Sequence, residues 1–204
     1  MTQRYILRID DVGRLNSDCP TSGSDIDLTY FFSWRAASGL NNVPAIYGIV
    51  PTWPSAIGRR LFNTQISVDQ QAIHGWDHAV GTTTSAQLML AKGFFPQARA
   101  FIPPFNEYDG KLIEHWRGVE GRHFFGGFDK EHHQFGEAPC TIGNMTHWNA
   151  VRGLYGTSAQ ILNNLDTVAE TEYPQVITLH VPWETDVSRL RELITKIKPF
   201  LVLP

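Results

Sequence analysis

The sequence lacks the usual features of secreted and membrane proteins. It has two cysteines, Cys19 and Cys140, so a disulfide framework is not expected, and both are interpreted as free thiols in a reducing compartment. No stretch approaches the roughly 20 consecutive apolar residues of a membrane-spanning helix. The first residues lack the apolar segment and the small-residue cleavage site of a signal peptide. These absences predict a cytoplasmic protein without a membrane span.

Clustered positive charge is also missing from the sequence. The net charge is −3, and no run of five like charges occurs. Because affinity for nucleic-acid phosphates depends on clustered Lys and Arg, no nucleic-acid partner is expected. No Gly-x-Gly-x-x-Gly and no phosphate-loop lysine motif follows the first predicted strand, which argues against a nucleotide site there.

What the sequence does contain is a regular alternation of strand and helix patterns. Helices are predicted over residues 27–37, 52–62, 84–94, 108–119, 157–170 and 186–197. Strands are predicted over residues 5–10, 43–50, 67–74, 98–102, 122–128, 145–151 and 175–181, and residues 200–203 are a candidate to close the sheet.

This alternation favours a parallel sheet with helices outside it, in a single domain over residues 1–204. Seven or eight strand–helix units suggest a barrel, but 204 residues fall short of the roughly 250 that an eightfold barrel usually has. We therefore predict an α/β fold with a distorted or incomplete (β/α) barrel. An open doubly wound sheet is the alternative.

Ionisable side chains gather where the predicted strands end. Asp10 and Asp11 end the first strand, His74 and His78 lie at the end of the third, and His180 ends a late one. In barrels of this kind, the carboxyl ends of the strands carry the chemistry. The sequence therefore predicts a site at that end of the barrel.

The histidine pair suggests a metal site. Two imidazoles four residues apart can face one ion, although Gly75 occupies the place of the glutamate found in metalloprotease helices. Either Asp10 or Asp11 can add a third ligand and leave one position open for water, as in catalytic zinc sites. Each feature taken alone also has an ordinary explanation, such as a turn cap or a core histidine.

Four short motifs occur together in this sequence: Ile9-Asp10-Asp11, His74-Gly75-Trp76-Asp77-His78, Pro103-Pro104-Phe105 and Leu179-His180. They occur in the order and approximate spacing of the motifs of the polysaccharide deacetylase superfamily, also called the NodB-homology group or carbohydrate esterase family 4. The resemblance spans residues 5 to about 183 and implies a seven-stranded, distorted (β/α) barrel that removes N-acetyl groups from sugars with a divalent metal, expected to be Zn²⁺.

The resemblance also implies a role for each matching residue. Asp10 would be the general base and His180 the general acid, while the backbone N–H of Phe105 would help to hold the oxyanion. The implied metal ligands are Asp11, His74 and His78.

The sequence departs from the family pattern at Ile102, where the family usually has an arginine that holds the catalytic aspartate. Arg8 lies two residues before Asp10 and so projects to the same side of its strand. We predict that Arg8 takes over this role, with Arg99 as the second candidate; an unrelated inward salt bridge of Arg8 is the alternative. Asp129 is a candidate remnant of the family's fourth motif.

Further aromatic and polar residues near the predicted mouth of the barrel are candidates for sugar binding, with core packing as the alternative for each aromatic. His132 and His133 lie in a polar segment that is interpreted as a solvated loop rather than a second metal site. The candidates for substrate binding are Trp76, Asn106, Tyr108, Trp183 and Glu184.

The functional hypothesis is a metal-dependent deacetylase that acts on an N-acetylated sugar in a cytoplasmic polysaccharide or lipopolysaccharide precursor. The alternative is a catalytically weak or inactive deacetylase-like barrel that binds carbohydrate or metal, which Ile102 favours. A third hypothesis is a metal-dependent hydrolase of the same fold that acts on an amide outside sugars.

Overall fold

The computed structural model describes residues 3–13, 25–79, 83–126, 128–129 and 138–204 of the chain. Cys19, His132 and His133 lie outside these residues, and so does the side chain of Asp129. Within the described part, no helix combines the length and the apolarity needed to cross a bilayer.

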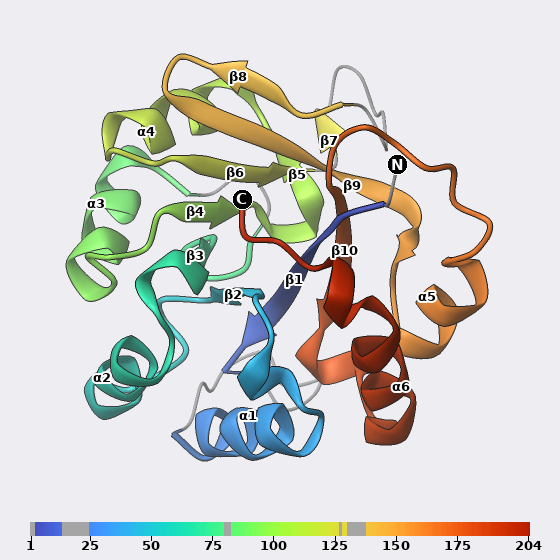
Figure 1. The fold of residues 1–204 in the computed structure, drawn as a ribbon. Helices are drawn as coiled ribbons and strands as arrows, with labels where there is room; N and C mark the ends of the chain where they lie inside the picture. Colours follow the sequence, from blue (N-terminus) through green and yellow to red (C-terminus); the bar gives the residue numbers. More distant parts are fainter. Residues whose placement is uncertain (1–2, 14–24, 80–82, 127, 130–137) are drawn as a thin grey trace.

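A closed barrel of seven parallel strands forms the centre of the molecule (Figure 1). Going round the barrel, the order is β10, β1, β2, β3, β4, β6 and β9, and β9 pairs with β10 to close the ring. The distorted seven-stranded (β/α) barrel predicted from the sequence is confirmed. Its strands are β1 (Tyr5–Val12), β2 (Ile46–Ile49), β3 (Gln71–His74), β4 (Ala100–Ile102), β6 (His123–Gly126), β9 (Met145–Tyr155) and β10 (Gln175–His180).

Three short strands lie outside this ring. β8 (Cys140–Ile142) pairs antiparallel with β9, and β5 (Glu107–Tyr108) pairs with β7 (Phe128–Asp129). The expectation that residues 200–203 close the sheet is wrong. Leu201 makes a single parallel bridge to Tyr5, because β9 already occupies the free edge of β10.

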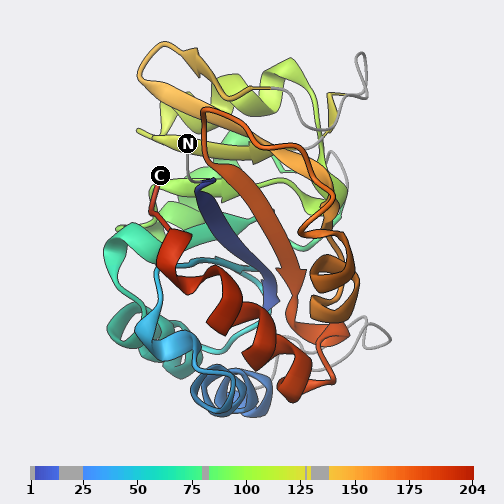
Figure 2. The same ribbon diagram turned by 45° about the vertical axis from the view of Figure 1, so that its right-hand side comes forward.

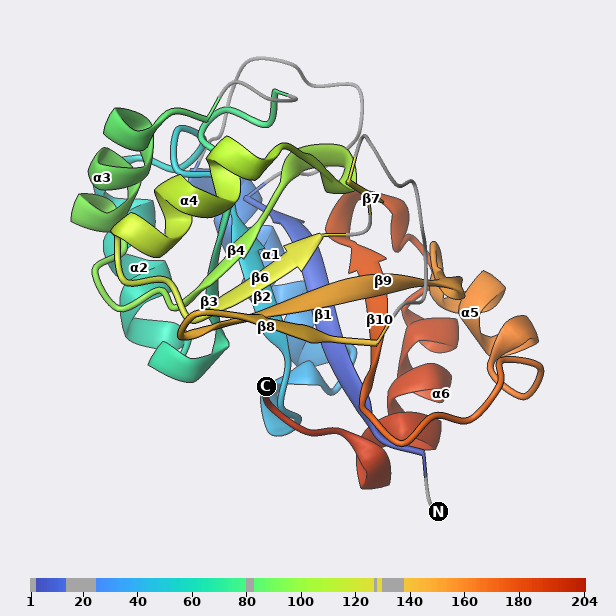
Figure 3. The ribbon, with the colours of Figure 1, turned by 90° about the horizontal axis from the view of Figure 1, so that it is seen from above.

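In the described part of the chain, six α-helices surround the barrel, with α2, α3 and α4 on one flank and α5 and α6 on the opposite flank (Figure 3). Figure 2 shows α6 running beside β10, next to α5. The helices are α1 (Asp25–Ala37), α2 (Ala56–Gln65), α3 (Ser85–Phe94), α4 (Gly110–Gly118), α5 (Ser158–Asn164) and α6 (Val187–Ile197), with 3-10 turns at Leu40–Asn42, Val68–Gln70, Pro104–Asn106, Val181–Trp183 and Lys198–Phe200.

Capping side chains set where these helices begin. Thr84 and Thr157 each form a capping box at the start of α3 and α5. The predicted start of α2 at residue 52 is wrong, because the hydroxyl of Ser55 accepts the N–H groups of Ile57 and Gly58 and begins the helix there. α5 ends at Asn164, six residues earlier than predicted.

The apolar residues form two layers, one inside the barrel and one between the barrel and the helices. Along β1, Leu7 and Ile9 face the helices, whereas Ile6 belongs to the inner layer. Arg8 and Asp10 share the inward side of β1 with Ile6, because side chains alternate along a strand. The inner layer consists of Ile6, Ile46, Ala72, Ala100, Ile102, Phe125, Trp148 and Val176.

Candidate functional site

The strand register brings the predicted site residues to one end of the barrel. Asp10 near the end of β1 pairs with His180 at the end of β10, and His74 ends β3. Tyr155, which we did not identify from the sequence, joins them from the end of β9. Nine of the predicted residues line one cavity of about 70 Å³ with it: Arg8, Asp10, Asp11, His74, His78, Phe105, Asn106, His180 and Trp183.

Asp11, His74 and His78 form a cluster with the donor set of a metal site. The Oδ1 atom of Asp11 lies 3.2 Å from Nε2 of His74 and 2.9 Å from Nε2 of His78. One ligand atom from each residue lies within 4.8 Å of the other two. Two imidazoles and one carboxylate are three ligands, so a tetrahedral zinc ion bound by them would keep a fourth position open, as catalytic zinc sites do.

The hydrogen bonds around His74 show that this cluster fits a cation. Nδ1 of His74 donates to the carbonyl oxygen of Ile102 at 3.0 Å, and the neutral ring then has its lone pair on Nε2. This Nε2 atom and Oδ1 of Asp11 are both buried, and within the described residues neither has a hydrogen-bond partner outside the cluster. Two acceptors facing each other need either a proton or a cation between them, so these residues fit a divalent metal.

The charges in the cluster are consistent with this fit. Burial alone would raise the pKa of Asp11, but hydrogen bonds and charge from His74 and His78 outweigh it, and the pKa lies well below the usual range. Burial would lower the pKa of His74, but Asp10 and Asp11 raise it instead. The carboxylates therefore attract either a proton or a metal to the imidazoles.

The backbone around the cavity holds an uncommon conformation. Five described residues other than glycine have a positive φ, and four of them line this cavity. Residues other than glycine rarely adopt this left-handed conformation. It persists where the surrounding structure enforces it, and such residues cluster at functional sites. These four residues are Asp11 (φ 59°), His78 (64°), Phe105 (56°) and Asn106 (59°).

Arg8 holds Asp10 through a buried, two-pronged ion pair. Nε of Arg8 donates to Oδ1 of Asp10 at 2.8 Å and Nη2 donates to Oδ2 at 2.5 Å, while Nη1 reaches the carbonyl oxygen of Phe125 at 3.3 Å. Both residues are fully buried. Burial would raise the pKa of Asp10, but the charges of Arg8 and His74 lower it. The carboxylate is therefore ionised near neutral pH.

The other arginine considered for this position lies elsewhere. Arg99 precedes β4 and makes an exposed ion pair with Asp69, 3.7 Å between Nη1 and Oδ1. Ile102 packs in the inner apolar layer instead of contributing a charge. In the structure Arg8 supplies the guanidinium, and its role in the reaction stays a prediction.

Replacing Arg8 tests how strongly this pair is coupled. Arg8→Met should lower the free energy of unfolding by about 3–5 kcal/mol, because it leaves the buried Asp10 carboxylate without its counter-charge. Urea denaturation of the metal-free protein measures the change. In an Asp10→Asn background the same substitution should cost much less. An equal cost in both backgrounds would show that packing, not the ion pair, accounts for the loss.

His180 lies among Asp10, Tyr155 and Trp183. Its Nε2 atom is 3.2 Å from the Tyr155 hydroxyl and 3.6 Å from Oδ2 of Asp10, and its ring stacks on Trp183 with centroids 4.0 Å apart. Burial lowers the pKa of His180, although the charges of Asp10 and Asp11 oppose this. Burial, followed by the charge of Asp10, raises the pKa of Tyr155 to about 12, so its hydroxyl keeps its proton.

The strand predicted over residues 145–151 stops four residues short of Tyr155. β9 continues to Tyr155 and pairs there with Thr178 of β10. A usable signal was present: Thr157 is a helix cap, and the residues before it read as one continuous strand.

Three predicted substrate contacts do not line the cavity. Trp76 stacks on Phe94 with ring centroids 6.1 Å apart. Tyr108 is buried among apolar residues of the outer layer. Glu184 is buried, and its Oε1 accepts the backbone N–H of Ser158 at 2.6 Å, at the start of α5. Each of these side chains has a packing or capping role in the structure, and its part in substrate binding stays a prediction.

No protein-family model and no curated protein matches the sequence. Solved structures do match. A candidate polysaccharide deacetylase from Mycobacterium smegmatis aligns with a TM-score of 0.61 at 10% identity, over all of this chain (100%) and 88% of that one. The family 4 carbohydrate esterase from Streptomyces lividans in complex with acetate aligns with a TM-score of 0.53 at 15% identity, over 97% of this chain and 90% of that one.

A third similar structure is a carbohydrate esterase family 4 pseudoenzyme from Bacillus anthracis, in a mutant form with restored enzymatic activity. It aligns with a TM-score of 0.57 at 12% identity, over 97% of this chain, and the chain spans 63% of its length. These likenesses confirm the resemblance at the level of the fold: the chain has the barrel of the polysaccharide deacetylases. The barrel occurs in an esterase and in a pseudoenzyme, so activity has to be argued from the site.

Proposed function

We propose that the protein is a metal-dependent deacetylase that hydrolyses an N-acetyl group on a sugar. The observation that carries the proposal is a single cavity that joins the Asp11, His74 and His78 cluster to an ionised Asp10 and to His180. A metal cluster, a base and a proton donor are the three groups that amide hydrolysis needs. The names of two proteins with the same fold, a family 4 carbohydrate esterase and a candidate polysaccharide deacetylase, support the substrate class.

Each group has a part in this reaction. A divalent cation such as Zn²⁺, held by Asp11, His74 and His78, would polarise the acetyl carbonyl and acidify the attacking water. Asp10 accepts the proton of that water, and the backbone N–H of Phe105 donates to the oxyanion. His180 gives a proton to the sugar nitrogen as the C–N bond breaks. The products are acetate and the free amino sugar.

Tyr155 positions His180 for this proton transfer. Its hydroxyl lies 3.2 Å from Nε2 of His180, while Oδ2 of Asp10 lies 3.6 Å from the same atom. A neutral, buried imidazole must receive its proton inside the cavity before it can pass it on. Asp10, which accepts the proton of the water, lies next to His180 and can pass that proton to the imidazole. Tyr155 holds the ring of His180 in place for this transfer.

Two substrates with different leaving groups show whether Tyr155 positions His180 for proton transfer or has only a structural role. Tyr155→Phe should slow release of acetate from an N-acetylated sugar by about tenfold or more, the value of one hydrogen bond in the transition state. Hydrolysis of 4-nitrophenyl acetate should change by less than about twofold, because 4-nitrophenolate leaves without a proton. The matched control is Tyr47→Phe, which removes a buried hydroxyl bonded to Arg35 outside the cavity. Equal losses on both substrates would remove Tyr155 from this role.

Acetate release tests the proposed function itself. The purified protein, loaded with Zn²⁺ or Co²⁺, is incubated with a panel of N-acetylated sugars that includes oligosaccharides and nucleotide-linked sugars. We expect metal-dependent acetate release from at least one of them and none after chelation. A fully metal-loaded protein that releases no acetate from the panel would contradict the proposal.

A second candidate function is a barrel that binds carbohydrate or metal without turning it over. Two observations favour it: Ile102 replaces the expected arginine, and the cavity formed by described residues holds only about 70 Å³. Small-molecule sites usually occupy about 300–1,000 Å³. Saturable binding of a sugar without acetate release would support this candidate. The cytoplasmic location stays a prediction.

A further inference from the structure

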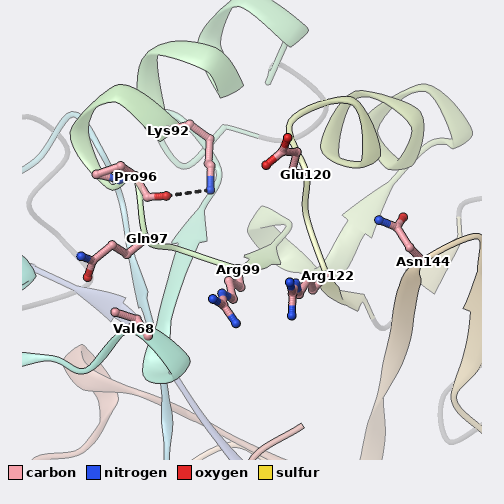
Figure 4. A pocket seen from close by; sticks show the side chains of 8 residues that line it. All are labelled: Val68, Lys92, Pro96, Gln97, Arg99, Glu120, Arg122 and Asn144. Atoms are coloured by element: carbon pink, nitrogen blue, oxygen red, sulfur yellow. Dashed lines mark hydrogen bonds between the residues drawn. The ribbon is translucent and has the colours of Figure 1, made fainter.

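A second, larger cavity lies at the opposite end of the barrel from the candidate site. It holds about 630 Å³ and sits where β4 and β6 begin, whereas the metal cluster lies where the strands end. Figure 4 shows the charged side chains directed towards this space from α3 and from the segments before the two strands. The polar and charged residues that line it are Lys92, Gln97, Arg99, Glu120, Arg122 and Asn144.

Arg99 and Arg122 are held next to each other by the backbone. The carbonyl oxygen of Arg99 accepts the N–H of Arg122 at 3.0 Å and that of His123 at 3.0 Å, because β4 and β6 are neighbouring strands. In Figure 4 the two guanidinium groups point to the same side. Two like charges are thus brought together by the sheet itself.

Few negative charges balance this pair. The contact of Arg99 with Asp69 is long, at 3.7 Å, and solvent-exposed, so it contributes little. Within the described residues no carboxylate forms an ion pair with Arg122. Glu120 is the one carboxylate among the residues lining the cavity. An anion between the two arginines would relieve their repulsion.

Lys92 adds a fixed positive charge to the same wall. Its Nζ donates to the carbonyl oxygens of Pro96 at 3.1 Å and Ala98 at 2.8 Å, which hold the ammonium in place. At the neighbouring His123, burial lowers the pKa and the charges of Arg122 and Arg99 lower it further, while the charge of Asp69 opposes them. The potential in this region is therefore positive although the whole chain is acidic, with a net charge of −3.

We propose that this cavity binds the phosphate group of a phosphorylated small molecule, between Arg99 and Arg122. Guanidinium groups match phosphate oxygens in two-pronged geometry better than a point charge does. The amides of Gln97 and Asn144 can donate from the edges of the cavity. Its volume of about 630 Å³ leaves room for an organic group beyond the phosphate. The site is independent of the proposed deacetylase chemistry.

Calorimetric titration of the full chain with inorganic pyrophosphate, at constant ionic strength, tests this site. We expect saturable binding by the wild type and a loss of about tenfold or more in affinity for Arg99→Gln and Arg122→Gln. The matched control is Arg152→Gln, which removes the same charge from an exposed position on β9 outside the cavity. All three positions are exposed, so equal melting temperatures can be required of the variants before they are compared.

The control decides whether a site exists. Retained pyrophosphate affinity in Arg152→Gln, with loss in the two cavity variants, supports the proposal. An equal loss in all three variants, or no saturable binding by the wild type, would overturn it. Binding to vesicles of anionic phospholipid without any response to pyrophosphate would also contradict it, because the arginines would then act as a membrane-facing surface.

Discussion

Removing either imidazole from the metal cluster is expected to empty it. His78→Ala and His74→Ala should each hold well below one zinc ion per chain after equilibration with a limiting zinc buffer, and lose turnover in proportion. Loss of an outer-shell partner already costs about 10–100-fold in metal affinity, so loss of a direct ligand should cost at least about 100-fold. Metal analysis of the dialysed protein measures the content.

The two variants differ in the loss of stability that the substitution itself should cause. The His78 side chain is 16% exposed, whereas that of His74 is 2% exposed and bonded to Ile102, so His78→Ala is the cleaner test. His115→Ala is the matched control, since His115 lies on α4 away from the cavity. If both cluster variants keep full zinc occupancy, the ligand assignment is wrong.

The second large effect concerns Asp10. Asp10→Asn should keep the metal and lower kcat by about 10²–10⁴-fold, the usual contribution of a general base. An amide has the shape of the carboxylate but cannot take a proton from water. The measurements are zinc content and the initial rate of acetate release.

Stability has to be separated from catalysis in this variant. Asp10→Asn also leaves the buried Arg8 without its counter-charge, which should cost about 3–5 kcal/mol. The double variant Arg8→Met/Asp10→Asn removes both charges and should recover much of that stability without recovering turnover. If either variant hydrolyses the substrate at a rate near that of the wild type, Asp10 is not the base.

The sequence was sufficient for the barrel and for most of the cavity. Alternating strand and helix patterns predict parallel strands whose carboxyl ends meet, so Asp10, His74 and His180 had to converge once the register was right. The place of Arg8 followed from strand alternation alone, because it lies two residues from Asp10.

The features of the structure that were not predicted from the sequence depend on contacts between distant segments. Tyr155 joins the cavity only because β9 continues four residues beyond the predicted end and pairs with β10 there. Glu184 follows His180 closely in sequence, but the start of α5 captures its carboxylate through Ser158. The arginine pair could not be predicted from the sequence, because Arg99 and Arg122 are 23 positions apart and meet only across β4 and β6.

Anomalous diffraction from crystals soaked in zinc tests the central claim most directly. The account predicts one ion bound by a carboxylate oxygen of Asp11 and by Nε2 of His74 and His78, with metal–ligand distances of about 2.0–2.2 Å and a position open to solvent. A zinc peak elsewhere in the molecule, with these three side chains hydrogen-bonded only to each other, would contradict it.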